Sequence, residues 1–567
     1  MAMYADKPLI IQSDMTVLLD TVHRDAEAAR TQLIRFAELA KRPGLMHTYR
    51  MTPLTLWNAA AGGWSAGDVL SALSSNARYG LPMQTEAAIT RYMGRYGKLR
   101  LELGQAGSLL LRGDSGLLAE AAGKPAVAAF LRGREADGSW CVSPDCRGRL
   151  KQELTRAGYP VIDTAGYHDG EALAVSMLSV TRSGQPFALR DYQQQAVDAF
   201  YREGSVQGGS GVVVLPCGAG KTIVGLAALA RSNSAALILT SNTTSVKQWK
   251  RELLERTSLA EEMVGEYTGQ LKQVRPITIA TYQIMTHRPS AESGYPHMRL
   301  FSERDWGLIV YDEVHLLPAP VFRMTAEIQA TRRLGLTATL VREDGCEEDV
   351  FSLIGPKLYE LVWKNAESMG HIATVSCSEI RVPLLPEAAQ QYHAAPERAK
   401  QRTAAENPAK LPVIRKLLER HSGKQTLIIG QYLDQLHEVS EKLGVPLITG
   451  ELSQPEREAW YDRFKKGEVP VLAVSKVANF AVDLPDAAVA IQISGSFGSR
   501  QEEAQRIGRL LRPKAGSNEA WFYTIVTEGT KEEQFARKRQ LFMVEQGYQY
   551  ETVRGAVSVD KAQRLDT

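Results

Sequence analysis

The chain has 567 residues, so a prior of about 100 to 200 residues per domain predicts three to five domains. Its 44% hydrophobic and 23% charged residues are typical of globular proteins, and no apolar run approaches the roughly 20 residues that span a bilayer, which excludes a membrane role. The formal net charge of +3 excludes a uniformly basic surface, so any surface that binds nucleic acid must be a local patch.

The N-terminal segment MAMYADKPLIIQSD contains acidic residues and lacks the basic-then-apolar layout of a signal peptide. The five cysteines show no repeated spacing, which indicates reduced thiols rather than a disulfide framework. Both features predict a cytoplasmic protein.

Two segments near the N-terminus have the apolar spacing of helices. They are VHRDAEAARTQLIRFAELAKRPG (22–44) and SAGDVLSALSSNARYG (65–80), with Gly or Pro at their ends. We therefore expect a helical N-terminal domain over residues 1–104. The pattern becomes shorter and mixed over 105–183, which predicts a separate small α+β domain.

Short β-rich runs alternate with helical stretches from about residue 211 onward. GVVVLP, AALILT, PITIAT, WGLIVYD and LGLTAT form one series, and KQTLIIG, VPLITG, VPVLAVS, AAVAIQIS and AWFYTIV form a second. This alternation is typical of parallel sheets covered by helices. We expect two tandem α/β domains over 184–368 and 369–550, a basic Ala-rich helical connector between them (385–410), and a tail over 551–567.

The first α/β series contains LPCGAGKT, residues 215–222, where a β-rich run ends and a helix begins. Glycines at 218 and 220 would let the backbone approach phosphate groups, and the N–H groups of the new helix would point at them. Lys221 would contact the β and γ phosphates of ATP, and Thr222 a Mg²⁺ ion. The expected nucleotide-binding residues of this loop are Pro216, Cys217, Gly218, Ala219, Gly220, Lys221 and Thr222.

A second motif, WGLIVYDEVH, ends an apolar run with Asp312 and Glu313. A carboxylate at a strand tip beside a phosphate loop can hold magnesium, while the next one orients and deprotonates the attacking water. We therefore assign Asp312 to the metal and Glu313 to the water. A surface turn that caps a helix is the alternative, which the phosphate loop makes improbable.

In the second α/β series, QEEAQRIGRLLRP places arginines at 506, 509 and 512, on one face of a helix. Such a stripe is commonly a solvated surface. Phosphoryl transfer, however, needs positive charge near the transition state, and an arginine supplied across a domain cleft accelerates it by about 10³ to 10⁵. Arg509 and Arg512 are the candidates for this role.

Together, LPCGAGKT, DEVH, TAT and QRIGRLLR resemble the motifs of superfamily 2 helicases, which have two RecA-like domains that close on ATP. The triplet Arg342-Glu343-Asp344 after TAT narrows the resemblance to the XPB family of DNA helicases, as do SNTTSVKQWK, LIGPKLYE and SKVANFAVDLPDA. The similarity covers about residues 130–550. The N-terminal TYRMTPLTLWNAAAGG resembles the leading domain of bacterial XPB proteins, and 105–183 occupies the place of the damage-recognition domain of this family.

The resemblance adds expected roles for further residues. FALRDYQQQAV is similar to an adenine-reading Q motif, so Gln193, supported by Arg190, would contact the base. The family resemblance also implies that Asp483 contacts the nucleotide and that Gln505 has a catalytic role. Residues expected to contact DNA or to couple DNA to ATP are Ser245, Thr281, Thr337, Thr339, Arg342, Glu343, Asp344, Ser475 and Lys476.

The chain departs from the family pattern at several places. Leu215 stands where the phosphate-loop motif has its first glycine, Ala481 replaces a common glycine, and 380–410 is too short for a large thumb-like insertion. The triplet 342–344 could still be a plain solvated turn.

The resemblance implies an ATP- and Mg²⁺-dependent DNA helicase that moves 3′ to 5′ along single-stranded, forked or damaged duplex DNA. It further implies a role in DNA repair, a bacterial, nucleoid-associated setting, and a nuclease or repair protein as a possible partner. A double-stranded DNA translocase without sustained unwinding remains open, as does a scaffold subunit that recruits a nuclease or a transcription complex.

Overall fold

The structure, a computed structural model, describes residues 6–41, 45–104, 107–290, 294–329, 331–339, 347–397, 399–475, 487–495, 503, 506–508, 510 and 518–554. The chain divides into two compact units, Met1–Leu215 with Gly220–Leu361 and Pro216–Ala219 with Val362–Thr567. None of the helices in these described ranges is both long and apolar enough to cross a bilayer.

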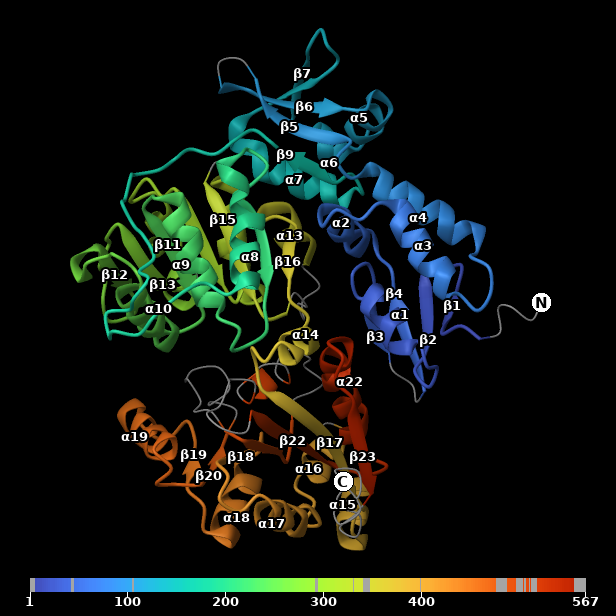
Figure 1. Ribbon diagram of the computed structural model, residues 1–567, viewed down its shortest axis with the longest axis vertical. Coiled ribbons are helices and arrows are strands. Elements are labelled where there is room, and N and C mark those ends of the chain that lie inside the picture. Colours follow the sequence, from blue (N-terminus) through green and yellow to red (C-terminus); the bar gives the residue numbers. More distant parts are fainter. Residues whose placement is uncertain are drawn as a thin grey trace. The chain divides into compact units, whose positions relative to one another are not determined.

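The N-terminal domain combines a sheet with helices, so the expectation of a purely helical domain is wrong. Its antiparallel sheet has the order β1-β2-β4-β3 (Figure 1). The strands are β1 (Leu9–Ile11), β2 (Thr16–Asp20), β3 (Glu38–Lys41) and β4 (Met46–Arg50). The helices are α1 (Ala26–Leu33), α2 (Pro53–Ala61), α3 (Ala66–Asn76) and α4 (Met83–Arg95). The first expected helix, 22–44, therefore shrinks to α1 and is followed by β3.

The small domain has the expected mixture of strands and helices. Its sheet has the order β7-β8-β6-β5-β9, and only β9 runs parallel to its neighbour. The strands are β5 (Leu99–Leu103), β6 (Leu109–Gly113), β7 (Leu131–Arg134), β8 (Trp140–Val142) and β9 (Val161–Asp163). The helices are α5 (Ser115–Ala122), α6 (Pro125–Ala128), η2 (Pro144–Cys146) and α7 (Arg147–Arg156). Because β5 belongs to this sheet, the domain begins before residue 105.

A buried ionic network fixes α7 of the small domain to the first α/β domain. Arg147 donates two hydrogen bonds to the Asp163 carboxylate, at 2.9 and 2.7 Å. Lys151 donates to the same carboxylate at 3.0 Å and to Gln329 of the α/β domain at 2.9 Å. Although burial opposes the effect, Lys151 and Arg147 hold the pKa of Asp163 well below its ordinary value. The Asp163 carboxylate is therefore paired with two cations, and Lys151 links the small domain to the first α/β domain.

The first α/β domain has a seven-stranded parallel sheet of the order β12-β13-β11-β14-β15-β10-β16. Its strands are β10 (Ser210–Val214), β11 (Ala236–Thr240), β12 (Val264–Tyr267), β13 (Ile277–Thr281), β14 (Leu308–Asp312), β15 (Arg332–Thr337) and β16 (Lys357–Glu360). Its helices are α8 (Asp191–Tyr201), η3 (Arg202–Gly204), α9 (Lys221–Ser232), α10 (Thr243–Arg256), η4 (Glu261–Met263), α11 (Tyr282–Met285), η5 (Pro296–Phe301), η6 (Val314–Leu316), α12 (Ala319–Glu327) and α13 (Glu347–Leu353). The predicted parallel sheet is confirmed.

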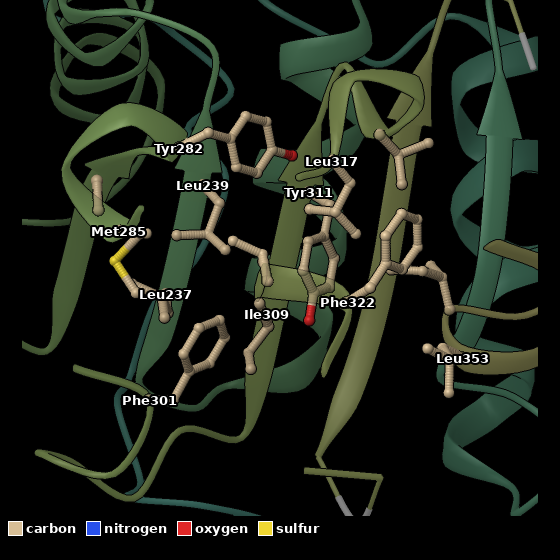
Figure 2. Close-up of a cluster of buried hydrophobic side chains, with 14 of the residues drawn as sticks. Leu237, Leu239, Tyr282, Met285, Phe301, Ile309, Tyr311, Leu317, Phe322 and Leu353 are labelled. Carbon is tan, nitrogen blue, oxygen red and sulfur yellow. The ribbon is translucent and has the colours of Figure 1, made fainter. Parts of the chain in front are cut away.

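The core of this domain lies against one face of the sheet (Figure 2). Leu237 and Leu239 of β11 and Ile309 and Tyr311 of β14 are at most 1% exposed. Buried parallel strands of this kind read as continuous apolar runs, because both of their faces are covered. The central strand β14 is thereby buried up to Tyr311, the residue before Asp312.

The second unit contains another seven-stranded parallel sheet, of the order β19-β20-β18-β21-β22-β17-β23. Its strands are β17 (Thr374–Val382), β18 (Thr426–Ile429), β19 (Leu447–Ile448), β20 (Val471–Val474), β21 (Val489–Gln492), β22 (Glu519–Thr527) and β23 (Tyr550–Arg554). Its helices are α14 (Trp363–Ser368), α15 (Pro386–Ala394), α16 (Lys400–Ala405), α17 (Lys410–Arg420), α18 (Leu433–Leu443), α19 (Gln454–Lys465) and α22 (Lys531–Glu545).

Two sequence expectations for this unit are wrong. The Ala-rich segment 385–410 forms α15 and α16, as a helical segment should, but it follows β17 and so lies inside the domain rather than between domains. The tail was expected to begin at 551, yet β23 extends to Arg554 and pairs with β17.

Candidate nucleotide site

The phosphate-loop sequence lies where it was expected, between the buried strand β10 and helix α9. Gly218 and Gly220 have φ of +82° and +81°, a region that glycine adopts without strain. Gly220 is the residue before α9, which begins at Lys221. Leu215, at the place of the usual glycine, is fully buried, and its N–H donates to the Thr337 carbonyl at 3.0 Å. It therefore extends the strand rather than forming the turn, which explains why a large apolar residue is accepted.

The carboxylates of DEVH lie at the carboxyl end of β14, close to the start of α9. Asp312 is the last residue of the strand. The Lys221 ammonium lies 2.9 Å from Oε1 of Glu313. Two motifs that are 92 residues apart in sequence, from Lys221 to Glu313, thus meet at one edge of the sheet. Thr222, next to Lys221 in the first turn of α9, is partly buried.

Burial and charge repulsion shift the pKa of Asp312 at this edge of the sheet. Burial, and then the neighbouring Glu313 carboxylate, raise the pKa of Asp312 to about 6, while Lys221 and Trp249 act in the opposite direction. Two adjacent carboxylates with one ammonium carry excess negative charge, which a cation would relieve. The oxygen donors of Asp312 and Thr222 suit a hard cation such as Mg²⁺.

His315 connects this edge to the TAT segment. Its Nδ1 lies 2.7 Å from Oγ1 of Thr337, and the Thr337 hydroxyl donates to the Thr339 carbonyl at 2.5 Å. Since that hydroxyl proton is already engaged, the hydrogen bond to His315 requires Nδ1–H as the donor. All three side chains are at most 5% exposed. The predicted residues Thr337 and Thr339 are therefore tied to DEVH, through a histidine to which the sequence reasoning gave no role.

Gln193 lies beside the phosphate loop, as the Q-motif interpretation requires. It is 4% exposed, and its Oε1 accepts from the Arg190 backbone N–H at 3.0 Å. A Cβ atom on Gly220 would lie only 2.5 Å from Nε2 of Gln193. The Arg190 guanidinium donates to the Tyr192 hydroxyl at 3.1 Å. The start of α8 thus packs directly on the start of α9.

Ser245 and Thr281, expected near DNA, both lie where a strand of this sheet leads into a helix. Ser245 is in the first turn of α10, and Thr281 is the N-cap residue of α11. The Ser245 N–H donates to the side chain of Asn242, which caps α10 at 2.9 Å. The Thr281 hydroxyl caps α11 by accepting from the Ile284 N–H at 3.2 Å. Thr281 is the last residue of β13 and Ser245 lies just beyond the end of β11, so both are at the carboxyl edge where parallel sheets commonly bind ligands.

In the second unit, Ser475 follows β20 and is 2% exposed. Arg506, the first arginine of the predicted stripe, is also buried, and its guanidinium donates to Gln492 at 2.6 Å. It therefore supports the sheet of its own domain. The remaining expected site residues lie outside the described ranges: Arg342, Glu343, Asp344, Lys476, Asp483, Gln505, Arg509 and Arg512.

The sequence reasoning also assigned no role to Trp249. Its indole Nε1 donates to Oδ2 of Asp312 at 2.9 Å, across 63 residues of sequence. The signal available in the sequence is a tryptophan flanked by polar residues, in SNTTSVKQWK.

Three family models match the chain. Residues 366–567 match ERCC3/RAD25/XPB C-terminal helicase, residues 186–342 match Type III restriction enzyme, res subunit, and residues 9–136 match Helicase conserved C-terminal domain.

Curated relatives match over nearly the whole chain. The DNA 3′-5′ helicase XPB of Kineococcus radiotolerans is 51% identical over 549 residues, covering 97% of this chain and 96% of the relative. The DNA 3′-5′ helicase XPB of Mycobacterium tuberculosis is 50% identical, covering 96% and 97%. The general transcription and DNA repair factor IIH helicase/translocase subunit XPB of Antonospora locustae is 33% identical, covering 97% and 82%. With these identities over almost its full length, and with the nucleotide-site motifs gathered at one sheet edge, the chain belongs to the XPB family of DNA helicases.

Proposed function

We propose that this protein is an ATP-dependent DNA helicase that moves 3′ to 5′, and that the edge formed by α9 and β14 is its hydrolytic centre. The observation that carries the assignment is the ion pair between Lys221 and Glu313, 2.9 Å apart, beside Asp312. A cation and two carboxylates at the carboxyl edge of a parallel sheet supply the charges that nucleotide hydrolysis needs. The DNA substrate and the polarity come from the family.

In this proposal the loop 216–222 binds the phosphates of ATP, and Lys221 pairs with their oxygens. Thr222 and Asp312 hold Mg²⁺, for which their oxygen atoms are suitable donors. When bound, the metal neutralises charge on the phosphates. The phosphate oxygens compete with Glu313 for the Lys221 ammonium, and this competition releases Glu313 from its ion pair.

Glu313, once released, accepts a proton from the attacking water. Its backbone has φ of +51°, a left-handed conformation that is uncommon for a residue with a side chain. This conformation turns the chain at the strand tip and leaves the carboxylate facing Lys221. Gln193 contacts the base, while Arg509 and Arg512 supply positive charge from the second α/β domain.

Translocation on double-stranded DNA without sustained unwinding is a second candidate. The relative from Antonospora locustae carries both terms, helicase and translocase, in its name. A forked duplex and a triplex-displacement substrate separate the two activities, because only a helicase opens the fork and either motor displaces a third strand.

The testing experiment measures ATP turnover by the purified chain with no DNA, single strand, duplex and fork. We expect turnover to rise with DNA and strand separation to accompany it on the fork. Glu313→Gln should leave ATP binding near normal but lower turnover by orders of magnitude, since the water loses its base. Normal turnover in that variant would remove Glu313 from the mechanism.

We further propose that the protein acts in DNA repair at the nucleoid, together with a nuclease or another repair protein. To test this association, the chain can be purified from cells: it should co-purify with chromosomal DNA and with a nuclease. Deletion of the nuclease gene should abolish this co-purification. Unchanged repair after removal of the chain from the cell would argue against it.

A further inference from the structure

Trp249 donates a hydrogen bond to a carboxylate of the proposed hydrolytic centre. The residue lies in α10 and is 1% exposed, and its indole N–H donates to Oδ2 of Asp312 at 2.9 Å. A buried indole N–H needs a hydrogen-bond partner. Here the partner is the residue proposed to hold the metal.

The second oxygen of the same carboxylate is also held. Oδ1 of Asp312 accepts from the backbone N–H of Glu313 at 3.1 Å. With one oxygen fixed by the chain's own turn and the other by Trp249, the plane of the carboxylate is set by two different elements. A shift of α10 would therefore rotate the carboxylate about its fixed oxygen.

The indole ring also rests on the helix that carries the phosphate-binding residues. A Cβ atom on Gly225 of α9 would lie only 2.4 Å from Cη2 of Trp249. Glycine is unfavourable inside a helix, so its position here is explained by the close approach of the ring. Gly225 lies three residues after Thr222, about one turn along the same helix. Trp249 thus contacts both halves of the nucleotide site.

The start of α10 is an expected site of DNA contact. Ser245, expected to lie near the DNA backbone, is four residues before Trp249, so both lie on neighbouring turns of one helix face. Four residues of helix span about 6 Å. The distance from the expected DNA contact to the metal-binding carboxylate is therefore one helical turn plus one side chain.

We propose that Trp249 is a positioning residue that couples DNA contact at the start of α10 to the orientation of Asp312, and hence to the rate of hydrolysis. This inference rests on the proposed function of the nucleotide site. DNA bound at residues 243–245 fixes α10, and the indole N–H then holds the carboxylate in the orientation that binds the metal.

The decisive variant is Trp249→Phe, which keeps an aromatic ring at this position but deletes the N–H group together with the distal ring atoms that face Gly225. We expect DNA affinity to stay within about twofold, while the stimulation of kcat by DNA falls at least tenfold. The affinity for Mn²⁺, a spectroscopic substitute for Mg²⁺, should fall several-fold when measured by electron paramagnetic resonance with a non-hydrolysable ATP analogue bound.

Leu253→Val is the matched control, because Leu253 is fully buried on the same helix one turn later. It should lower the unfolding midpoint but keep DNA stimulation and Mn²⁺ affinity. The proposal would be overturned if Trp249→Phe kept wild-type DNA stimulation and Mn²⁺ affinity. It would also be overturned if Leu253→Val lost as much of both, because Trp249 would then contribute only to packing. A wild-type chain without DNA-stimulated turnover would instead refute the proposed function, and the Mn²⁺ comparison would still decide the role of Trp249.

Discussion

Replacement of Asp312 by Asn should stabilise the nucleotide-free protein while it abolishes hydrolysis. The amide has nearly the same shape as the carboxylate but cannot ionise. Its oxygen can still accept from Trp249, while its NH2 group cannot accept from the Glu313 N–H, so that hydrogen bond is lost. Burial and the Glu313 carboxylate raise the pKa of Asp312 from 3.8 to about 6, so the ionised form is disfavoured in the folded state. The difference of about 2 in pKa corresponds to at most about 3 kcal/mol.

The sign of this effect depends on pH. Between about pH 4 and 6 the folded wild type keeps a proton on Asp312 that the unfolded chain releases, so wild-type stability falls as pH rises through this window. Above pH 6 the full penalty is present, and Asp312→Asn should be the more stable protein by up to about 3 kcal/mol. Below pH 4 this advantage should vanish, and Asp312→Asn should be slightly the less stable protein because it lacks the hydrogen bond from the Glu313 N–H.

The measurement is urea unfolding of the metal- and nucleotide-free chain at pH 7.5 and 4.5. Hydrogen exchange in peptides that cover β14 isolates the relevant domain, because a chain of several domains need not unfold in one step. Asp169→Asn is the control, since that side chain is 96% exposed and should change stability little at either pH. A destabilised Asp312→Asn at pH 7.5, or a difference that does not change with pH, would refute the reasoning.

Three further changes test other parts of the molecule. Asp163→Asn should lower the free energy of unfolding of the first unit by about 3 to 5 kcal/mol, because it leaves Arg147 and Lys151 as uncompensated buried cations; a loss under about 1 kcal/mol in urea would contradict this. Arg509→Ala and Arg512→Ala should reduce kcat far more than nucleotide affinity, whereas equal losses would indicate a ground-state contact. Replacement of 342–344 by three alanines should preserve basal ATPase activity and impair fork unwinding more than DNA-stimulated hydrolysis. Wild-type unwinding at matched ATP turnover would instead indicate that the triplet is only a solvated turn.

The parallel sheets could be predicted because their central strands are buried on both faces and therefore read as apolar runs. The N-terminal sheet could not be found in this way. Its strands have three to five residues, and β2 buries only alternate side chains such as Val17 and Leu19. The Ala-rich segment was misplaced because β17, TVSCSEIRV, has too many polar residues to read as an inner strand. Pairing with β22 and β23, which are distant in sequence, makes β17 an inner strand of the sheet.

Sequence spacing located Lys221, Asp312 and Glu313 because their motifs have fixed relations to strand ends. The roles of Trp249 and His315 depend on which way a helix or a turn faces after folding, and a pattern of residue types does not determine that. The Trp249 contact crosses 63 residues, and the His315 contact with Thr337 crosses 22.

Two consecutive residues at the tip of β14 are unfavourable for folding. Asp312 carries a carboxylate that burial and its neighbour make harder to ionise, and Glu313 occupies a left-handed conformation that costs about 1 to 3 kcal/mol for a residue with a side chain. Glycine at 313 and asparagine at 312 would relieve both. The rigid apolar core beneath the strand (Figure 2) offsets these costs, and strain that is retained at one edge in this way is typical of a site kept for chemistry. The physical state of Asp312 and Glu313 therefore supports the proposed hydrolytic role of this edge.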